Sequence, residues 1–260
     1  MGTNKTIDLD KAIDMPANGI DVIPTGIPSL DGMLGGGLHA GSLNVIASRP
    51  GMGKTSLALQ IAENLAATGR HVLFFELEML KEQIVKFARR QRGELPIWDT
   101  LYFDDTGDID PIYIRRQLRS VGNCDAVFVD YLQLLMVGPG WPVWDGGVRA
   151  MRALKALAGS ENVPVIVTSQ LPRPDALPRF YEKENCLRPI LSDLAILSDV
   201  GNPEQFTDVV IFPFRESYYS EEPELKDKNE LIVAKNHYGA TGSIPVHWKP
   251  EKMIFEEKVE

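Results

Sequence analysis

The sequence predicts an α/β fold with a mostly parallel central sheet, flanking helices and an antiparallel extension near the C-terminus. From Ser42 onward, short apolar runs alternate with turns and amphipathic stretches, a pattern typical of βα units around a parallel sheet. A glycine-rich segment, SRPGMGKTS at residues 48–56, joins the first apolar run to the first amphipathic stretch. After residue 207, three apolar runs follow with no helical stretch between them, which indicates antiparallel pairing.

Each element is expected from its own local pattern. The expected strands are residues 42–47, 71–76, 126–130, 164–169, 208–214, 230–235 and 243–248, and the expected helices are residues 56–68, 80–92, 112–121 and 148–158. Gly69 is placed to end the first helix as a C-terminal cap, and Gly93 to end the second. Asp110 and Pro111 supply an N-cap and a first-turn proline for the third helix, which Gly122 ends.

The remaining segments have little periodicity. Residues 171–205 are rich in Pro, Asn, Asp and Ser, and we expect long loops with one short helix there. Residues 1–24 are expected to form a lead or linker stub with one helical turn at residues 8–14. The pattern therefore predicts one domain over residues 25–260.

Composition excludes several classes of protein. The longest mostly apolar stretch, residues 126–137, contains Asp130 and Gln133 and is too short to span a bilayer. No basic start with an apolar run marks a secretory signal, and the two cysteines are far apart, which argues against a zinc site or disulfide framework. A cytoplasmic protein that does not contact membranes is expected. The net charge of −9 argues against a surface coated for non-specific DNA binding, although it leaves room for a narrow basic channel.

The glycine-rich segment carries the main chemical signal. Gly53, Lys54 and Thr55 match the end of the phosphate-binding consensus GxxxxGK[ST], whereas Ser48 stands where its first glycine belongs. Backbone N–H groups of this loop are expected to wrap a β-phosphate at a helix N-terminus. Lys54 is then expected to reach the β- and γ-phosphates, with the Thr55 hydroxyl on Mg²⁺. The candidate nucleotide-binding residues of the loop are Ser48, Arg49, Pro50, Gly51, Met52, Gly53, Lys54, Thr55 and Ser56.

Hydrolysis needs further groups at neighbouring strand ends. Asp130, which closes the run AVFVD, is the candidate for holding the metal and its water shell. Glu78, just past the run HVLFFE, is the candidate for activating the attacking water, and Glu76 is its rival. Gln170, at the end of PVIVTSQ, is a candidate sensor of the γ-phosphate. ATP and Mg²⁺ are therefore the expected cofactors.

Nine segments in order resemble the C-terminal RecA-like motor domain of DnaB-type replicative helicases. They are PTGIPSLDGMLGGGL, ASRPGMGKTS, FELEMLKEQI, VFVDYLQLL, RALKALA, VPVIVTSQLPR, RPILSDL, EQFTDVVIFPFRESYY and IVAKNHYGATG, which together cover nearly all of residues 24–256. The resemblance implies a P-loop NTPase that hydrolyses ATP, and it favours Glu78 over Glu76 as the base. It also implies that Arg215 lies near the nucleotide base, that six motor domains form a ring, and that single-stranded DNA passes through the ring during DNA replication. Other replication proteins are expected partners.

Two departures from that family weaken parts of this expectation. The family carries a lysine and an arginine that reach the neighbouring subunit's γ-phosphate, and here Lys235 is retained while His237 stands at the arginine position. Because histidine is mostly neutral at pH 7, slow turnover is expected. The family's DNA-facing loop reads DLRESG, whereas this chain reads DLAILS, with Ala195 in place of the arginine. Ile196 and Leu197 of that loop are expected to suit a protein partner better than a phosphate backbone.

These departures leave an alternative function open. A helicase-like ATPase acting as a nucleotide-dependent assembly or regulatory module would need neither the arginine nor DNA contacts. A third reading, a relative of recombinases or clock ATPases, fits the entry segment TGIPSLDGMLGGGL, but DYLQLL and EQFTDVVIF count against it.

Overall fold

The computed structural model describes residues 21–92, 99–135, 146–171, 188–197, 203–218 and 228–258. The helical turn expected at residues 8–14 and the expected helix stop at Gly93 lie outside the described residues. Within these ranges, no helix combines the length and the apolar character needed to cross a membrane.

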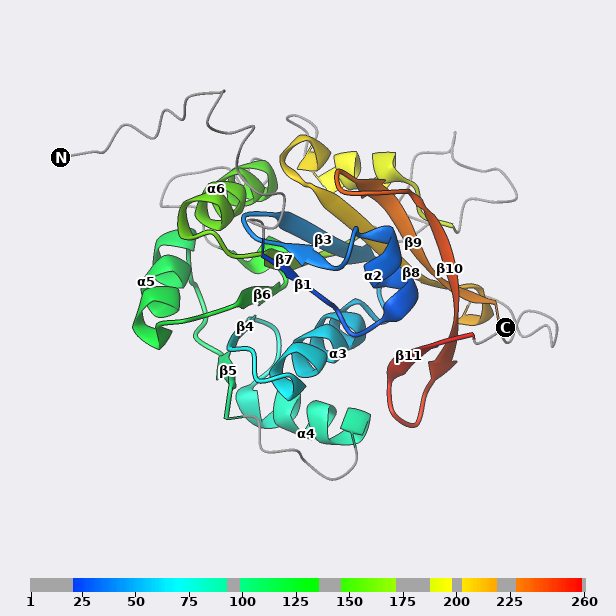
Figure 1. Ribbon diagram of the computed structural model, residues 1–260, viewed down its shortest axis with the longest axis horizontal. Coiled ribbons are helices and arrows are strands. Elements are labelled where there is room, and N and C mark those ends of the chain that lie inside the picture. Colours follow the sequence, from blue (N-terminus) through cyan, green and yellow to red (C-terminus); the bar gives the residue numbers. More distant parts are fainter. Residues whose placement is uncertain are drawn as a thin grey trace.

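The central element is a nine-stranded sheet with the order β11-β10-β9-β8-β3-β7-β6-β4-β5 (Figure 1). Its strands are β3 (Leu43–Ser48), β4 (Val72–Glu76), β5 (Leu101–Asp104), β6 (Ala126–Asp130), β7 (Val165–Gln170), β8 (Val209–Arg215), β9 (Asn229–Asn236), β10 (Gly242–Lys249) and β11 (Ile254–Glu257). The strands from β8 to β5 in this order are parallel, while β9, β10 and β11 add antiparallel pairs. The predicted parallel sheet with its antiparallel extension is confirmed.

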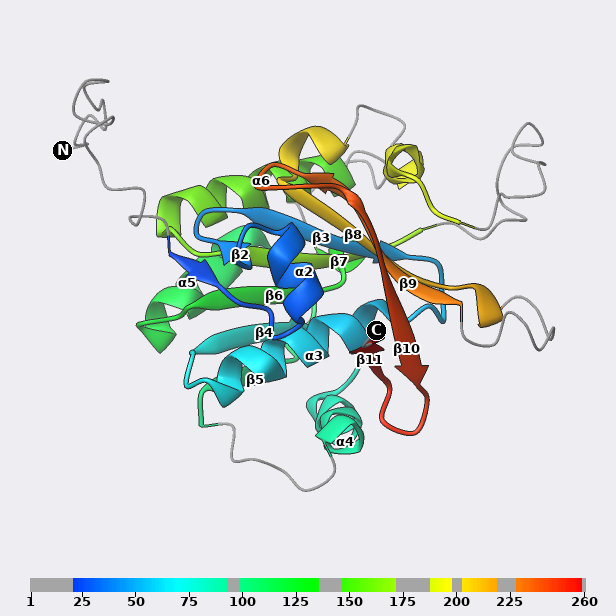
Figure 2. The ribbon, with the colours of Figure 1, turned by 45° about the vertical axis from the view of Figure 1, so that its right-hand side comes forward.

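Helices cover both faces of the sheet (Figure 2). They are α2 (Pro28–Met33), α3 (Lys54–Ala67), α4 (Lys81–Arg92), α5 (Pro111–Val121) and α6 (Gly146–Glu161). Buried residues of α2, α3 and α4 share one apolar core with one face of the sheet, and buried residues of α5 and α6 share a second core with the other face. Because both faces are covered, the central strands are apolar on both sides, as buried parallel strands usually are.

The helix boundaries follow the local signals. The Asp110 side chain accepts a hydrogen bond from the Tyr113 N–H at 2.7 Å, which caps α5, and Gly122 after it has a φ of 82°. At the end of α3, the Arg70 N–H reaches back to the Leu65 carbonyl, and Gly69 takes a φ of 83° that an L side chain rarely adopts. Both ends therefore match the expected caps.

The sequence pattern missed the shortest elements. These are α2, β5, β11 and a two-stranded sheet of β1 (Val22–Ile23) and β2 (Leu38–His39). In place of one short helix, the described part of residues 171–205 holds two 3₁₀ segments, Leu191–Leu197 and Pro203–Phe206. Strands of two to four residues are too short for their alternation to stand out from loop sequence.

Candidate nucleotide-binding site

Five strand ends converge at one edge of the sheet. Parallel strands place their carboxyl ends together, and β3, β4, β6, β7 and β8 end respectively at Ser48, Glu76, Asp130, Gln170 and Arg215. The register confirms this, since Ser48 is paired with Gln170 and Glu76 with Asp130. Open α/β sheets bind ligands at this edge. All of these residues except Glu76, the rival for the base, are site residues that the sequence predicts.

The glycine-rich loop between β3 and α3 has the backbone of a phosphate cradle. Gly51 has a φ of 81° and Gly53 a φ of 98°, so both occupy the left-handed region that favours glycine. A Cβ on Gly51 would lie 2.7 Å from the Tyr218 ring, and one on Gly53 would lie 2.9 Å from the Phe255 ring. Ser48 ends a regular strand and does not have a positive φ. A serine therefore fits where the consensus has glycine.

Helix α3 begins at Lys54, directly behind this loop. The first turn of a helix leaves N–H groups without intrahelical partners and carries a partial positive charge, which favours a bound phosphate. The Lys54 ammonium lies 5.3 Å from the centre of the Tyr131 ring, so its side chain extends toward the end of β6. Thr55 is half-buried beside it, while Met52 and Ser56 are buried. The loop thus presents a cation, a hydroxyl and the N–H groups of a helix start together.

Two carboxyl groups lie side by side at the ends of β4 and β6. Glu76 and Asp130 are each 1% exposed. The Thr168 hydroxyl donates to Asp130 Oδ1, whereas Asp130 Oδ2 and Glu76 Oε2 are buried without a hydrogen-bond partner among the described residues. Burial, reinforced by the charge of Asp130, raises the pKa of Glu76 to about 8. An unpaired buried carboxylate oxygen is unusual, and Asp130 Oδ2 suits a hydrated cation at this point.

Glu78 and Gln170 flank this pair. Glu78 is exposed, two residues beyond the end of β4. Gln170 is held by Gln133, whose amide Nε2 donates to the Gln170 carbonyl at 2.9 Å and whose Oε1 accepts from the Gln170 N–H at 3.3 Å. This clamp joins the segment after β6 to the end of β7.

Arg215 borders a cavity of about 190 Å³ next to the loop. Its guanidinium stacks 4.4 Å from the centre of the Trp248 ring and donates to the Gly51 carbonyl at 3.0 Å. Burial lowers the pKa of Arg215. Gly53, Lys54, Thr55 and Phe87 also line the cavity. An aromatic ring and a planar cation beside a phosphate cradle give a flat surface suited to a nucleobase.

Arg49 connects the loop to the segment that resembles the family's DNA-facing loop. Arg49 and Asp193 are both buried, at 5% and 4% exposed. Burial raises the pKa of Asp193, and the Arg49 charge partly offsets that rise. Ala195 follows in the same 3₁₀ segment, but the side chains of residues 195–197 lie outside the described part of the chain.

Lys235 and His237 lie toward the opposite edge of the sheet. Strand β9 is antiparallel to β8, and Lys235 pairs with Val210, five residues before Arg215. At about 3.3 Å of rise per residue, this separates the backbone of Lys235 from that of Arg215 by roughly 17 Å. The sequence-predicted residues therefore form two groups. The strand-end group includes the glycine-rich loop, and a second group faces away from it.

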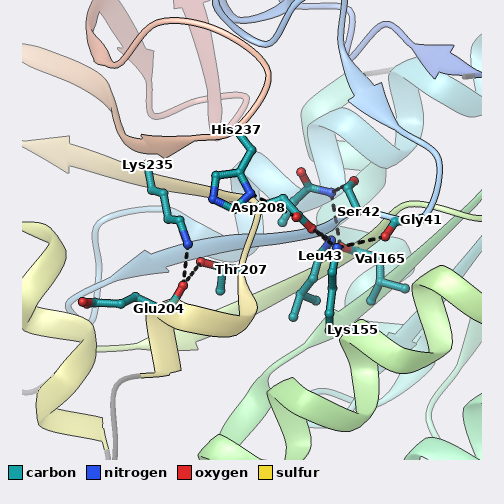
Figure 3. Close-up of polar contacts among 11 residues, drawn as sticks. Gly41, Ser42, Leu43, Lys155, Val165, Glu204, Thr207, Asp208, Lys235 and His237 are labelled. Carbon is teal, nitrogen blue, oxygen red and sulfur yellow. Dashed lines mark hydrogen bonds and ion pairs between the residues drawn. The ribbon is translucent and has the colours of Figure 1, made fainter. Parts of the chain in front are cut away.

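The second group is held in a polar network (Figure 3). The Lys235 ammonium donates to the Glu204 carbonyl at 2.7 Å, and His237 Nδ1 lies 3.3 Å from Asp208 Oδ1. Asp208 Oδ2 also accepts from the Lys155 ammonium at 2.5 Å and from the Leu43 N–H at 2.7 Å. Burial, with Lys155 nearby, lowers the pKa of Lys235 despite the opposing charges of Asp208 and Glu204.

Several site residues were missed from the sequence. Trp248 and Phe255 come from the C-terminal strands and pack on Gly53. Tyr131 follows Asp130 directly, and Gln133 comes three residues after it. Both Tyr131 and Gln133 belong to the segment DYLQLL, where polar residues between apolar ones could have indicated that they are part of the site. Nothing in the pattern pointed to Trp248.

Loops of this kind, with two left-handed glycines between a parallel strand and a helix, define a P-loop nucleotide-binding protein. The strand order and the antiparallel extension place this chain in the RecA-like class of such proteins. The chain belongs to the family of the DnaB-like helicase C terminal domain, whose model matches residues 22–96 and 93–257.

Individual relatives agree with this family. The chain is 32% identical to the replicative DNA helicase DnaB of Buchnera aphidicola subsp. Baizongia pistaciae over 93% of its own length and 58% of that protein. It is 33% identical to the replicative DNA helicase DnaB of Geobacillus stearothermophilus over 85% of its length and 53% of that protein. The chain therefore spans little more than half the length of these relatives.

Solved structures show the same fold. One solved structure, of an isolated ATPase domain, matches with a TM-score of 0.82 and 26% identity, covering 96% of each chain. A DnaB-like replicative helicase, studied with its interactions with primase, matches with a TM-score of 0.79 and 27% identity, covering 95% of this chain and 66% of that one.

Proposed function

We propose that this chain is an ATP-hydrolysing motor domain that moves single-stranded DNA during replication. The observation that carries the proposal is the convergence of the glycine-rich loop, Asp130 and Gln170 at one sheet edge, in a member of the DnaB-like family. We further propose residues 25–260 as one domain, residues 1–24 as its lead, and the cytoplasm as its compartment, because its relatives are replicative helicases.

The geometry supports the following proposed roles. Lys54 neutralises the β- and γ-phosphates, and the N–H groups of Gly51, Gly53 and Lys54 bind the β-phosphate. Gln170 senses the γ-phosphate from the neighbouring strand end, and exposed Glu78 orients and deprotonates the attacking water. Arg215 and Trp248 contact the base. The remaining loop residues shape the cradle.

The residues present fit a magnesium ion. Asp130 Oδ2 is buried and lacks a hydrogen-bond partner within the described part of the chain, and the Thr55 hydroxyl stands at the start of α3. Oxygen donors of this type are those that Mg²⁺ prefers. A magnesium ion held there would supply positive charge that offsets the negative charge of the phosphates. Thr55 and Asp130 would hold it, and Asp130 would stay aligned through its bond to Thr168.

The second group of residues supports an oligomer. Lys235 and His237 lie too far from their own chain's loop to touch its nucleotide, so they suit the γ-phosphate of a neighbouring copy. In a closed ring, every copy presents Lys235 and His237 to one neighbour and its own nucleotide to the other neighbour. We propose a hexamer, by analogy with the family, with single-stranded DNA and other replication proteins as partners.

The first test is steady-state ATP hydrolysis with and without single-stranded DNA, over a range of protein concentrations. We expect the rate per subunit to rise with protein concentration, and to rise further with DNA. The DNA effect should weaken steeply as salt increases, because phosphate contacts release counterions. A slow rate that neither DNA nor concentration changes would contradict the motor function.

An alternative is a nucleotide-dependent assembly or regulatory module without unwinding. The observation that favours it is His237, which stands at the family's arginine position and is paired with Asp208. Such a module would bind ATP and Mg²⁺ and change its oligomeric state, but DNA would not stimulate its turnover.

Substituting His237 by arginine is expected to speed turnover. We propose that the natural chain hydrolyses ATP slowly because a half-exposed histidine replaces a permanent cation. An arginine finger contributes roughly 10³–10⁵ in rate in other NTPases, so a rise of at least about tenfold is expected from His237→Arg. The measurement is ATPase rate against protein concentration, since a residue that acts on a neighbour has an effect only in the assembled state.

His247→Arg, on β10, is the matched control and should leave the rate unchanged. An unchanged rate in His237→Arg at every protein concentration would mean that this position does not face a neighbour's nucleotide.

A further inference from the structure

The turn that carries Glu78 connects the end of β4 to the start of α4. It covers residues 77–80, and the backbone N–H groups of such a turn need acceptors from elsewhere. The Leu77 N–H donates to the Asp130 carbonyl at 2.8 Å, as the last bond between the two strands. The Leu80 N–H donates to Gln83 Oε1 at 3.0 Å at the start of the helix. The middle of the turn is left without backbone partners from strand or helix.

The Glu76 side chain supplies an acceptor for these N–H groups. Its Oε1 accepts hydrogen bonds from the Glu78 N–H at 3.1 Å and from the Met79 N–H at 3.0 Å. The same side chain is 1% exposed, at the end of a strand in the middle of the fold. It therefore ties the backbone of Glu78 to a rigid part of the sheet, whereas the Glu78 side chain itself is exposed.

The position of Glu76 also argues against its being the base. Its Oε1 already accepts two backbone N–H groups, and its Oε2 is buried beside Asp130. A general base must reach the proton that it removes, directly or through one water. A side chain engaged in this way is better suited to hold a neighbour than to exchange protons with an attacking water.

We propose that Glu76 is a positioning residue that fixes the turn carrying Glu78, so that the Glu78 carboxylate is aimed at the water that attacks the nucleotide. The inference rests on the proposed function of Glu78. It assigns to Glu76 a role separate from phosphate or metal binding. Misplacing a reacting group by about 1 Å is enough to cost roughly 10²-fold in rate.

The test compares turnover with nucleotide binding in four variants. Glu76→Leu removes both acceptor oxygens while keeping a similar volume, so turnover is expected to fall about 10- to 100-fold. The affinity for an ATP analogue, measured by fluorescence with and without Mg²⁺, should stay unchanged. Glu76→Gln keeps an acceptor oxygen at the same place and should restore most of the turnover. Glu78→Gln defines the loss when the base itself is removed.

The double variant Glu76→Leu/Glu78→Gln decides whether Glu76 acts through Glu78. If it does, the double variant should be no slower than Glu78→Gln alone, because the two losses share one cause. A further loss in the double variant, or full activity in Glu76→Leu, would overturn the positioning role while leaving Glu78 as the base. Thermal unfolding of each variant separates these outcomes from loss of fold, and if Glu76→Leu does not fold, Glu76→Met replaces it.

An active Glu78→Gln variant together with an inactive Glu76→Gln variant would overturn both assignments. In that case Glu76 would be the base, and the proposed function of Glu78 would be wrong. The two failures are therefore distinguishable by the turnover of Glu78→Gln, which is slow if only the positioning role fails and active if Glu78 is not the base.

Discussion

Replacing Lys54 by alanine is expected to lower ATP turnover by about 10²–10³-fold, the range observed when one preorganised charge-stabilising donor is removed from an active site. Lys54 is the first residue of α3, and it is the cation of the glycine-rich loop. Negative charge on the transferred phosphoryl group would lose its nearest compensating charge in the variant. Nucleotide affinity should fall as well, because the phosphates are charged in the ground state too. Calorimetric titration with an ATP analogue and a steady-state assay measure the two effects.

Lys81→Ala is a matched control. Lys81 is also the first residue of a helix that follows a strand of the same sheet, but it is exposed and lies outside the cavity. Its removal should change neither affinity nor rate. If Lys54→Ala kept wild-type turnover, the glycine-rich loop would not be the phosphate site, and both proposed functions would fail together.

Replacing Asp130 by asparagine is expected to lower Mg²⁺-dependent turnover by roughly 10²-fold, through loss of the charge that we propose holds the metal. Asparagine keeps the size of the side chain and an oxygen that can still accept from Thr168. The fold should therefore be retained. Affinity for nucleotide without Mg²⁺ should not fall, whereas the gain in affinity on adding Mg²⁺ should shrink. Titration of an ATP analogue at several Mg²⁺ concentrations gives both quantities.

Asp125→Asn serves as the comparison, because Asp125 precedes the other end of the same strand and pairs with Arg70 at 2.7 Å. That ion pair is partly exposed, and such pairs contribute little to stability. The variant should keep the Mg²⁺ response. An unchanged Mg²⁺ response in Asp130→Asn would remove this carboxylate from the metal site.

The sequence was sufficient for the central part of the fold. Strands β3, β4, β6 and β7 are continuous apolar runs because helices cover both faces of the sheet, and such runs stand out against amphipathic helices. The start of α5 and the end of α3 could be predicted because Asp110 and Gly69 cap these helices through contacts with residues close by in sequence. In contrast, β1, β2 and β5 are stabilised by pairing with segments that are not adjacent in sequence, which no local pattern records, and β11 pairs with adjacent β10 but has only 4 residues.

The candidate site residues that close a strand could be predicted from the sequence. Asp130 and Gln170 could be placed because each closes an apolar run that leads to a common edge. The register that sets Glu76 beside Asp130 depends on strand order, and so the hold of Glu76 on the turn could not be seen in advance. Trp248 was missed for a similar reason, since a strand far away in sequence carries it to the loop.

The contact between Gly53 and the Phe255 ring has a consequence for biosynthesis. The glycine-rich loop is made first, and the aromatic ring that packs against it is made about two hundred residues later. Strand β3 likewise has both of its edges paired only after β7 and β8 have been made. Such long-range pairings are closed late and slowly during folding. A growing chain would therefore acquire a finished nucleotide site only after Phe255 had been made, when its parallel strands had already been synthesised.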